Sequence, residues 1–134
     1  MEREWMEKLS SKGEVIRLIQ DILGCGCPRE VFEHIQIEMT WTNHIPMLQL
    51  ILGNKLLVWI VDGMKIDRLR DRVSTLLEQG RAERDKRNLN RFRLVMVGDV
   101  PTPEANELLT LPEANHTKVH LHILPQLLGQ VITR

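Results

Sequence analysis

The N-terminal part of the chain carries hydrophobic residues at an approximately helical spacing. Residues 4–23 repeat apolar side chains with this period, and Gly13 is a weak point, so the pattern predicts one helix or two short ones. Pro28 suits the first turn of a second, short helix over residues 28–34, because proline has no N–H to lose there and its φ is already helical.

From residue 35 onward the hydrophobic period becomes that of a strand. Residues 35–42 alternate apolar and polar side chains, which predicts a strand with one solvated face. The next two apolar runs, 46–52 and 56–61, flank Gly53 and Asn54, a pair that tolerates the positive φ of a tight turn. The sequence therefore predicts an antiparallel hairpin.

The second half of the chain alternates predicted helices and strands. Residues 65–79 place apolar side chains at helical spacing, and Gly80 is expected to end this helix. A very polar stretch follows over residues 81–90, and residues 92–97 predict the fourth strand.

The last predicted helix and strand complete the fold. Thr102 is expected to be the N-cap of a short helix with Pro103 at its first position, and residues 118–124 predict the final strand. The order is thus α-α-β-β-β-α-β-α-β. It predicts a single α/β domain over residues 1–134, with a mixed sheet of about five strands, an antiparallel hairpin and helices packed on the sheet.

The composition of the chain limits which binding partners and which cellular location are expected. The chain has 18 Lys plus Arg and 18 Asp plus Glu, so its formal net charge is zero and no attraction of the whole molecule to nucleic acid or an anionic membrane is indicated. No apolar run approaches the roughly 18 to 20 residues of a membrane span. The N-terminus is charged and mixed in sign, unlike a secretory signal, so a cytoplasmic location is expected.

The two cysteines are the most informative candidates for chemistry. Cys25 and Cys27 flank a single glycine, and a bridge between them closes almost no loop, so a structural disulfide is not expected. Reduced thiols, a bound metal or a transient redox bond are the alternatives. Cys27 is predicted at the N-cap of the second helix, where the helix dipole would favour its thiolate, with Cys25 as a resolving thiol.

A metal site is the second interpretation of the same cysteines. Thiolates select soft metal ions such as zinc, copper(I) or iron–sulfur centres. Alternation along the last strand places Lys118, His120 and His122 on one face, so Cys25, Cys27, His120 and His122 together would complete a tetrahedral site, with His116 as another candidate ligand. The structural alternatives are small buried cysteines in a turn and a solvated strand face.

The last strand also bears a resemblance to a known family. Residues 118–124 are similar, over about seven residues, to the signature of the histidine-triad nucleotide hydrolases, which alternates three histidines with apolar residues. The resemblance implies that His120 attacks a substrate phosphate. Lys118 stands where the family has its first histidine, and the family's upstream motifs are absent.

An excess of basic residues marks the segment 65–93. It is about five charges positive while the whole chain is neutral. Arginine suits phosphate, so Arg81, Arg84 and Arg87 are candidates for binding a phosphate or a nucleic-acid backbone. Interleaved acidic residues and the near absence of aromatic residues instead favour a solvated, salt-bridged surface.

Two aspartates follow predicted strands. Asp62 and Asp99 come at the carboxyl ends, where α/β sheets usually bind ligands, so they could hold a metal ion or serve as acid and base. With Cys27, they are the candidate catalytic residues. Both also suit turns and helix caps. The α-β-β-β-α-β order resembles that of restriction-endonuclease-like nucleases, but the hairpin offers Gln49 and Lys55 in place of their Asp and Glu-x-Lys.

Three functional hypotheses result. The first is a thiol-based metal or redox site at Cys25 and Cys27, assisted by His120 and His122. The second is a phosphate or nucleic-acid binding module that uses the arginines of residues 65–93. The third is a non-catalytic subunit whose exposed Trp5 and methionines form a homo-oligomer interface.

Overall fold

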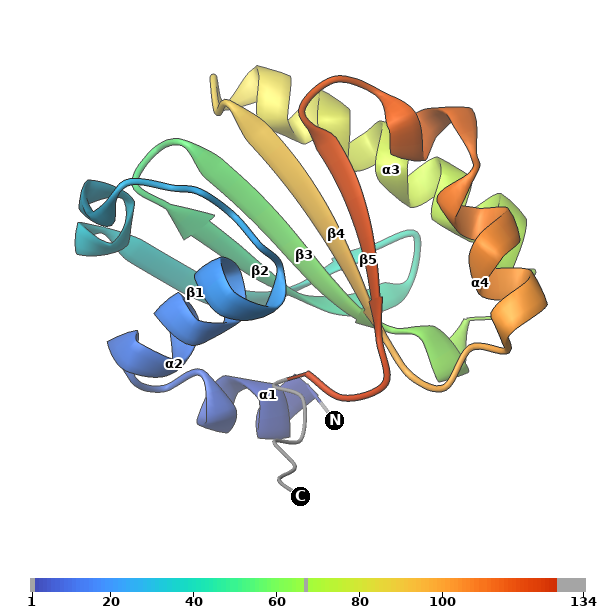
Figure 1. Cartoon of the computed structure of the whole chain (residues 1–134), viewed down its shortest axis with the longest axis horizontal. Helices are drawn as coiled ribbons and strands as arrows, with labels where there is room; N and C mark the ends of the chain where they lie inside the picture. Colours follow the sequence, from blue (N-terminus) through green and yellow to red (C-terminus); the bar gives the residue numbers. More distant parts are fainter. Residues whose placement is uncertain (1, 67, 128–134) are drawn as a thin grey trace.

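The protein is built around one mixed sheet of five strands (Figure 1). The computed structural model describes residues 2–66 and 68–127. The strand order in the sheet follows the sequence, and the strands are β1 (Ile35–Thr42), β2 (Ile45–Leu52), β3 (Leu56–Asp62), β4 (Arg91–Val97) and β5 (Val119–Leu124). β1, β2 and β3 pair antiparallel, whereas β3, β4 and β5 pair parallel. The predicted mixed α/β sheet and element order are confirmed.

Helices cover both faces of this sheet, which makes three layers (Figure 1). On one face lie α1 (Glu2–Lys8), α2 (Lys12–Ile16) and the π-helix η1 (Arg17–Ile22). The longer helices α3 (Leu69–Lys86) and α4 (Thr102–Leu109) cover the other face. Short 3₁₀ helices η2 (Arg29–Glu33), η3 (Gly63–Lys65) and η4 (Pro112–Asn115) connect these elements.

Alternation along the strands explains the two separate cores. Val58 and Ile60 of β3 join the core under α1, α2 and η1, whereas Leu57 and Trp59 join the core under α3 and α4. Every residue of β3 is buried because both faces of this central strand are covered. The sheet therefore presents different side chains to each helical layer. On either face, the side chains come from every second residue of each strand.

The N-terminal helical segment divides into two short helices, as one of the two alternatives predicted, but the break precedes α2 and the predicted weak point, Gly13, lies inside that helix. α1 ends at Lys8, and Ser11 is the N-cap of α2, where its hydroxyl accepts a hydrogen bond from the Glu14 backbone N–H over 3.2 Å. The prediction that Trp5 is exposed is wrong, because its ring is 3 % exposed and packs in the core on this face. The most exposed tryptophan is Trp41 on β1, at 66 %.

The predicted end of the central helix at Gly80 is wrong. α3 continues through Gly80 to Lys86. The absence of a side chain at Gly80 instead permits close packing of α3 against the sheet. A Cβ built on Gly80 would overlap the ring of Phe92 on β4. Sequence reasoning treated this glycine as a helix terminator, whereas it serves the contact between α3 and the sheet.

Smaller differences occur at two other ends. Pro101, not Thr102, is the N-cap residue of α4, and Thr102 is the first helical residue. Lys118 precedes β5 and has a φ of 67°, so the strand begins one residue later than predicted. The hairpin at Gly53 and Asn54 has the predicted positive φ at both residues.

The helices of the described chain have one further property in common. Within residues 2–66 and 68–127, none of them combines the length and the apolar character that crossing a membrane requires.

Candidate functional site

A cavity of about 350 Å³ brings together several of the residues singled out by sequence. It lies at the N-terminal ends of β3 and β4, and its lining comprises Cys25, Gly26, Cys27, Pro28, Val31, Lys55, Leu56, Asn90, Arg91, Arg93 and His120. This volume falls at the lower end of the range for small-molecule sites. The cysteines and one histidine of the last strand therefore share one cavity.

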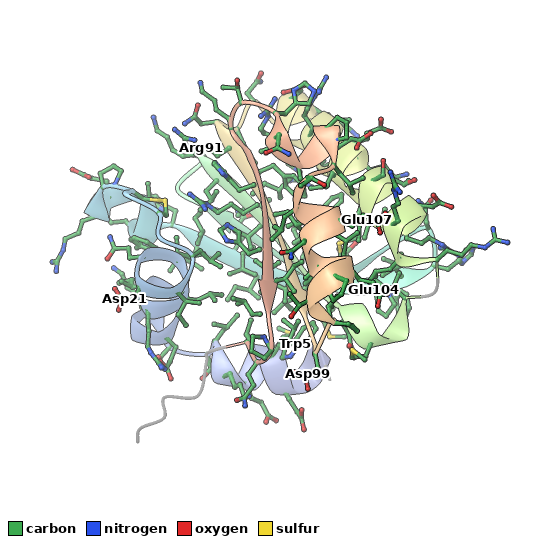
Figure 2. All side chains as sticks on the ribbon, turned by 45° about the vertical axis from the view of Figure 1, so that its right-hand side comes forward. Trp5, Asp21, Arg91, Asp99, Glu104 and Glu107 are labelled. Carbon is green, nitrogen blue, oxygen red and sulfur yellow. A yellow bond between two sulfur atoms is a disulfide. The ribbon has the colours of Figure 1, made fainter. Side chains whose placement is uncertain are left out.

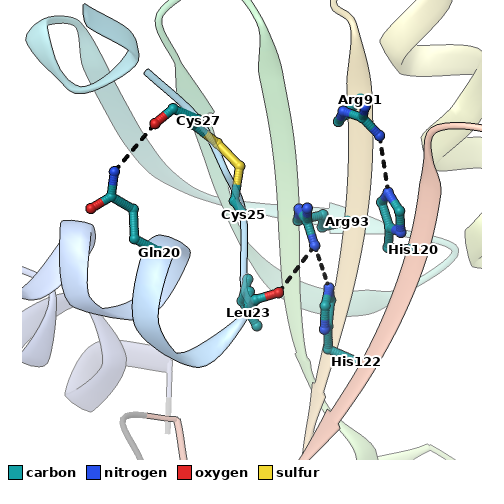
Figure 3. Close-up of a disulfide and its surroundings, with 8 residues drawn as sticks. All are labelled: Gln20, Leu23, Cys25, Cys27, Arg91, Arg93, His120 and His122. Carbon is teal, nitrogen blue, oxygen red and sulfur yellow. Dashed lines mark hydrogen bonds between the residues drawn. A yellow bond between two sulfur atoms is a disulfide. The ribbon is translucent and has the colours of Figure 1, made fainter. Parts of the chain in front are cut away.

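The cysteine turn is held against the π-helix by backbone contacts (Figure 3). The backbone N–H of Cys25 donates to the Ile19 carbonyl over 3.0 Å, and the Gln20 side-chain amide donates to the Cys27 carbonyl over 3.3 Å. Cys25 is buried at 7 % exposure, whereas Cys27 is only partly buried.

Cys25 and Cys27 are joined in a disulfide, which corrects the expectation that their spacing disfavours a bridge (Figure 3). Their Cα atoms lie 5.3 Å apart, within the roughly 4.4–6.8 Å that disulfides span. The turn after Leu23, with Gly24 at a φ of 73°, brings the two side chains to the same side. The bridge still contributes little to stability, because so short a loop restricts the unfolded chain little.

The opposite wall of the cavity comes from the turn between β2 and β3. The backbone N–H of Gly53 donates to the His34 carbonyl over 2.8 Å, and a Cβ on Gly53 would lie 2.6 Å from the Cα of Val31. Only glycine permits this approach of η2 to the hairpin. As a result, exposed Lys55 reaches the same cavity as the cysteine turn.

Two arginine–histidine pairs lie on the cavity face of β4 and β5 (Figure 3). The distance between Arg91 Nη1 and His120 Nε2 is 3.3 Å, and that between Arg93 Nη1 and His122 Nε2 is 2.9 Å. Arginine only donates, so in each pair Nε2 accepts and the neutral ring carries its proton on Nδ1. The parallel register makes both pairs neighbours on one face.

These contacts lower the pKa of both histidines. Burial, then Arg93 and His120, lower the pKa of His122 from its ordinary value to about 4. Burial, then Arg93 and Arg91, also lower the pKa of His120. Both rings are therefore neutral hydrogen-bond acceptors at neutral pH, and the positive charge of this face resides on the arginines.

Arg93 is the most unusual group of the cavity. It is 7 % exposed, and its Nη1 also donates to the Leu23 carbonyl over 3.3 Å, while its buried Nε has no hydrogen-bond partner. Burial and the nearby Arg91 lower its pKa, but a guanidinium stays charged at neutral pH. Within residues 2–66 and 68–127, Arg93, Arg91 and Lys55 form no ion pair with a carboxylate.

The predicted four-residue metal set is only partly brought together. Cys25, Cys27 and His120 line the cavity, whereas His122 is directed to Arg93. In the described part of the chain, no group of three or more His, Cys, Asp or Glu side chains is arranged to hold a metal ion. His116 lies elsewhere, with Arg81 Nη1 at 2.6 Å from its Nε2. The metal interpretation stays a prediction.

The predicted helix N-cap at Cys27 is wrong. Pro28 is the N-cap of η2, and this 3₁₀ helix has only five residues. The helix dipole is therefore not the source of thiolate stabilisation at Cys27. The cations that line the cavity are the groups of the site that would stabilise a thiolate.

The three arginines predicted to bind phosphate contact other parts of the chain. Arg84 bonds Asp85 over 2.8 Å, and Arg87 bonds Glu83 over 2.6 Å. Arg81 contacts His116 as described above. These interactions agree with the salt-bridged alternative for this surface, and phosphate binding there stays a prediction.

Asp62 and Asp99 lie at the other end of the sheet from the cavity. Figure 2 shows Arg91 and Asp99 at opposite ends of the molecule, and Asp62 ends β3. The carboxylate of buried Asp62 accepts a hydrogen bond from the Met64 backbone N–H over 2.9 Å, which caps η3. Asp99 is exposed. A catalytic role for either residue stays a prediction.

The three cations that line the cavity were not among the predicted site residues. Arg91 and Arg93 belong to the arginine-rich segment of the second hypothesis, but its named candidates are Arg81, Arg84 and Arg87, and Lys55 enters only through the nuclease motif. A signal was present, because Arg91 and Arg93 alternate with apolar residues on one strand exactly as His120 and His122 do on the next. The strand register decides whether two such patterns share a face, and here it pairs Arg93 with His120, so they do.

Comparisons of the chain with protein-family models, curated proteins and solved structures found no match. The resemblances to histidine-triad hydrolases and restriction-endonuclease-like nucleases thus stay predictions from a short motif and an element order.

Proposed function

We propose that this protein carries out thiol–disulfide exchange at Cys25 and Cys27. The observation that carries the proposal is that the bonded pair lines a cavity whose other charged residues, Lys55, Arg91 and Arg93, are all cations. A bridge across one residue adds little to stability, so chemistry is the better reason for the two sulfurs to be paired. Disulfides in the cytoplasm, the location expected from the sequence, are usually transient and catalytic.

The unequal exposure of the two sulfurs assigns their roles. An external thiolate attacks the partly buried Cys27 sulfur, a mixed disulfide forms there, and the bond to Cys25 breaks with its electron pair left on the Cys25 sulfur. A second external thiolate attacks the external sulfur of the mixed disulfide, which releases the Cys27 thiolate. In total, two external thiols and the protein disulfide are converted into an external disulfide and the protein dithiol.

The cations of the cavity support this chemistry in both directions. Positive charge near a thiolate lowers the pKa of its thiol, and a leaving thiol of lower pKa departs faster. The thiolate released from Cys25 would form inside the cavity, where Arg93 is buried without a counter-charge. In the reverse direction, Cys27 attacks an external disulfide and Cys25 resolves the intermediate.

Metal binding by the reduced pair is a second candidate. His120 lines the same cavity as both sulfurs, so two thiolates and one neutral imidazole would be available to a zinc ion. Elemental analysis of protein purified under reducing conditions tests it. Zinc retained by the wild type and lost from a Cys25→Ser/Cys27→Ser variant would favour this candidate.

The exchange reaction is tested with single-cysteine variants. The wild type, equilibrated in glutathione buffers and alkylated, should change by two thiols in one two-electron step. A Cys25→Ser variant should accumulate a mixed disulfide at Cys27 quickly, whereas Cys27→Ser should react much more slowly through the buried Cys25. A Gly26→Ala variant is the matched control, because a Cβ there meets no atom within 4 Å and both sulfurs remain.

Two results would contradict the proposal. The first is a wild type that keeps two free thiols in every glutathione buffer. The second is an equal reaction rate of the two single-cysteine variants, which would show that the cavity does not distinguish the sulfurs.

A further inference from the structure

Among the described residues, the cavity lining has no negatively charged side chain to balance its cations. Among residues 2–66 and 68–127, Arg93 is buried and cationic, its Nε has no partner, and the lining contains Arg91 and Lys55 but no Asp or Glu. Burying a cation without a counter-charge is costly, and buried charges in proteins are normally paired. The neutral histidines accept hydrogen bonds from the arginines without neutralising them.

We infer that this cavity is a binding site for the oxyanion group, a carboxylate or a phosphate, of a small molecule. Arginine presents several N–H donors in one plane, which matches both carboxylate and phosphate oxygens. Of the three cations that line the site, Arg93 is buried, Arg91 is half-buried and Lys55 is exposed.

The size and lining of the cavity favour a small ligand. A volume of about 350 Å³ accommodates a small molecule. Among the described residues, the lining contains no Phe, Tyr or Trp ring on which a base would stack, although stacking on such rings is the usual device of single-stranded nucleic-acid sites. The basic segment of residues 65–93 thus contributes to a small-anion site through its last two arginines rather than through the surface of α3.

The position of the disulfide defines the substrate class further, and this step rests on the proposed exchange function. Cys25 and Cys27 line the same cavity as the three cations, so a substrate whose oxyanion is held by Arg93 would carry its thiol or disulfide to Cys27. The preferred substrate is therefore a small anionic thiol, with the anionic group a few bonds from its sulfur.

Anion binding is tested first on a variant that has no exchange chemistry. Inorganic phosphate and succinate are titrated separately into Cys25→Ser/Cys27→Ser protein, and binding is followed by calorimetry. At least one of the two should bind saturably, and the one that binds identifies the oxyanion. Adding Lys55→Gln or Arg91→Gln should weaken that binding about tenfold or more, because each removes a charged donor.

Controls separate local contacts from overall charge and from folding. Lys12→Gln makes the same charge change as Lys55→Gln at an exposed position outside the cavity, and it should bind as the parent does. Lys55 is exposed, so its substitution leaves the core intact even where Arg93→Gln fails to fold. Failure of both anions to bind, or equal weakening by Lys12→Gln, would overturn the inference.

Substrate preference is tested by exchange rates with 3-mercaptopropionate, which is anionic, and cysteamine, which is cationic. Each rate is divided by the rate of the same thiol with a free aromatic disulfide, so intrinsic reactivity cancels. The wild type should prefer 3-mercaptopropionate, and Lys55→Gln and Arg91→Gln should reduce that preference. Exchange without charge preference would overturn the inference and leave the proposed function intact. Anion binding without any exchange would leave the oxyanion site standing and reject the proposed function.

Discussion

Arg93 on β4 donates a hydrogen bond over 2.9 Å to Nε2 of His122 on β5. Arg93 also donates a hydrogen bond to the Leu23 carbonyl, just before the cysteine turn. The Arg93–His122 pair therefore links the cavity to the rest of the fold. It requires a neutral imidazole, since a protonated ring has no acceptor to offer. The protonation state of one histidine on an edge strand is thereby coupled to the position of the buried arginine beside the disulfide.

Stability should fall with acid because of His122. Its pKa is about 4 in the folded protein, against about 6.5 in the unfolded chain. Between these values the unfolded chain binds a proton that the folded protein does not, so the free energy of unfolding decreases as the pH falls from 6.5 to 4, by about 3 kcal/mol in total. Urea denaturation at a series of pH values measures this.

A His122→Gln variant is the comparison for the pH series. Its side chain does not titrate, so its stability should vary less over the same interval, with His120 still contributing in the same direction. Parallel stability curves for the wild type and His122→Gln between pH 6.5 and 4 would be inconsistent with the assigned protonation state.

Arg93 should prove more important for binding than for stability. Replacing it with methionine removes a buried cation that no carboxylate neutralises, and such replacements are often neutral or stabilising. We expect Arg93→Met to unfold at an equal or higher urea concentration than the wild type at pH 7.5, and to lose anion binding. A loss of about 2 kcal/mol or more would indicate a structural role instead.

Gly80 should not tolerate even one added methyl group. A Cβ at this position overlaps the Phe92 ring, so Gly80→Ala must displace either α3 or the ring, although alanine is the better helix former. We expect a loss of about 1–3 kcal/mol in unfolding free energy, the usual result of overpacking. A combined Gly80→Ala/Phe92→Leu variant should lose less than the sum of its two single variants, which a double-mutant cycle measures.

Reduction of the disulfide should change stability only slightly. In the chain-entropy model, a loop of this length contributes about 1.5 kcal/mol, about half of what a 15-residue loop contributes. Urea denaturation with and without a phosphine reductant should therefore differ by no more than about this amount. A Cys25→Ala/Cys27→Ala variant should be insensitive to the reductant, and a much larger effect on the wild type would identify the bridge as structural.

The sequence predicted the elements best where the hydrophobic period was clear. The alternation over residues 35–42 predicted β1, the apolar runs on either side of the Gly53–Asn54 turn predicted the antiparallel hairpin of β2 and β3, and the element order predicted the mixed sheet. Errors arose where a residue serves a distant contact. Gly80 is the clearest example, because a glycine needed for the approach of Phe92 has the same local pattern as one that ends a helix.

Burial of the individual side chains also depended on distant contacts. The oligomer hypothesis requires an exposed Trp5, yet this side chain is buried in the core on the face of α1. Cys27 was predicted at a helix N-cap from the proline that follows it, but Pro28 occupies that position in the folded chain. Local patterns do not record which surface an element packs against.

The candidate site shows the same division between local pattern and fold. The sequence by itself determined that Cys25 and Cys27 share a turn, and that His120 and His122 share a strand face. Only the tertiary structure decided that the turn and the strand meet, with Arg91, Arg93 and Lys55 between them. The reason is physical: periodicity defines which side of an element a residue occupies, whereas the pairing of β3, β4 and β5 and the packing of η1 on the sheet define which sides face one another.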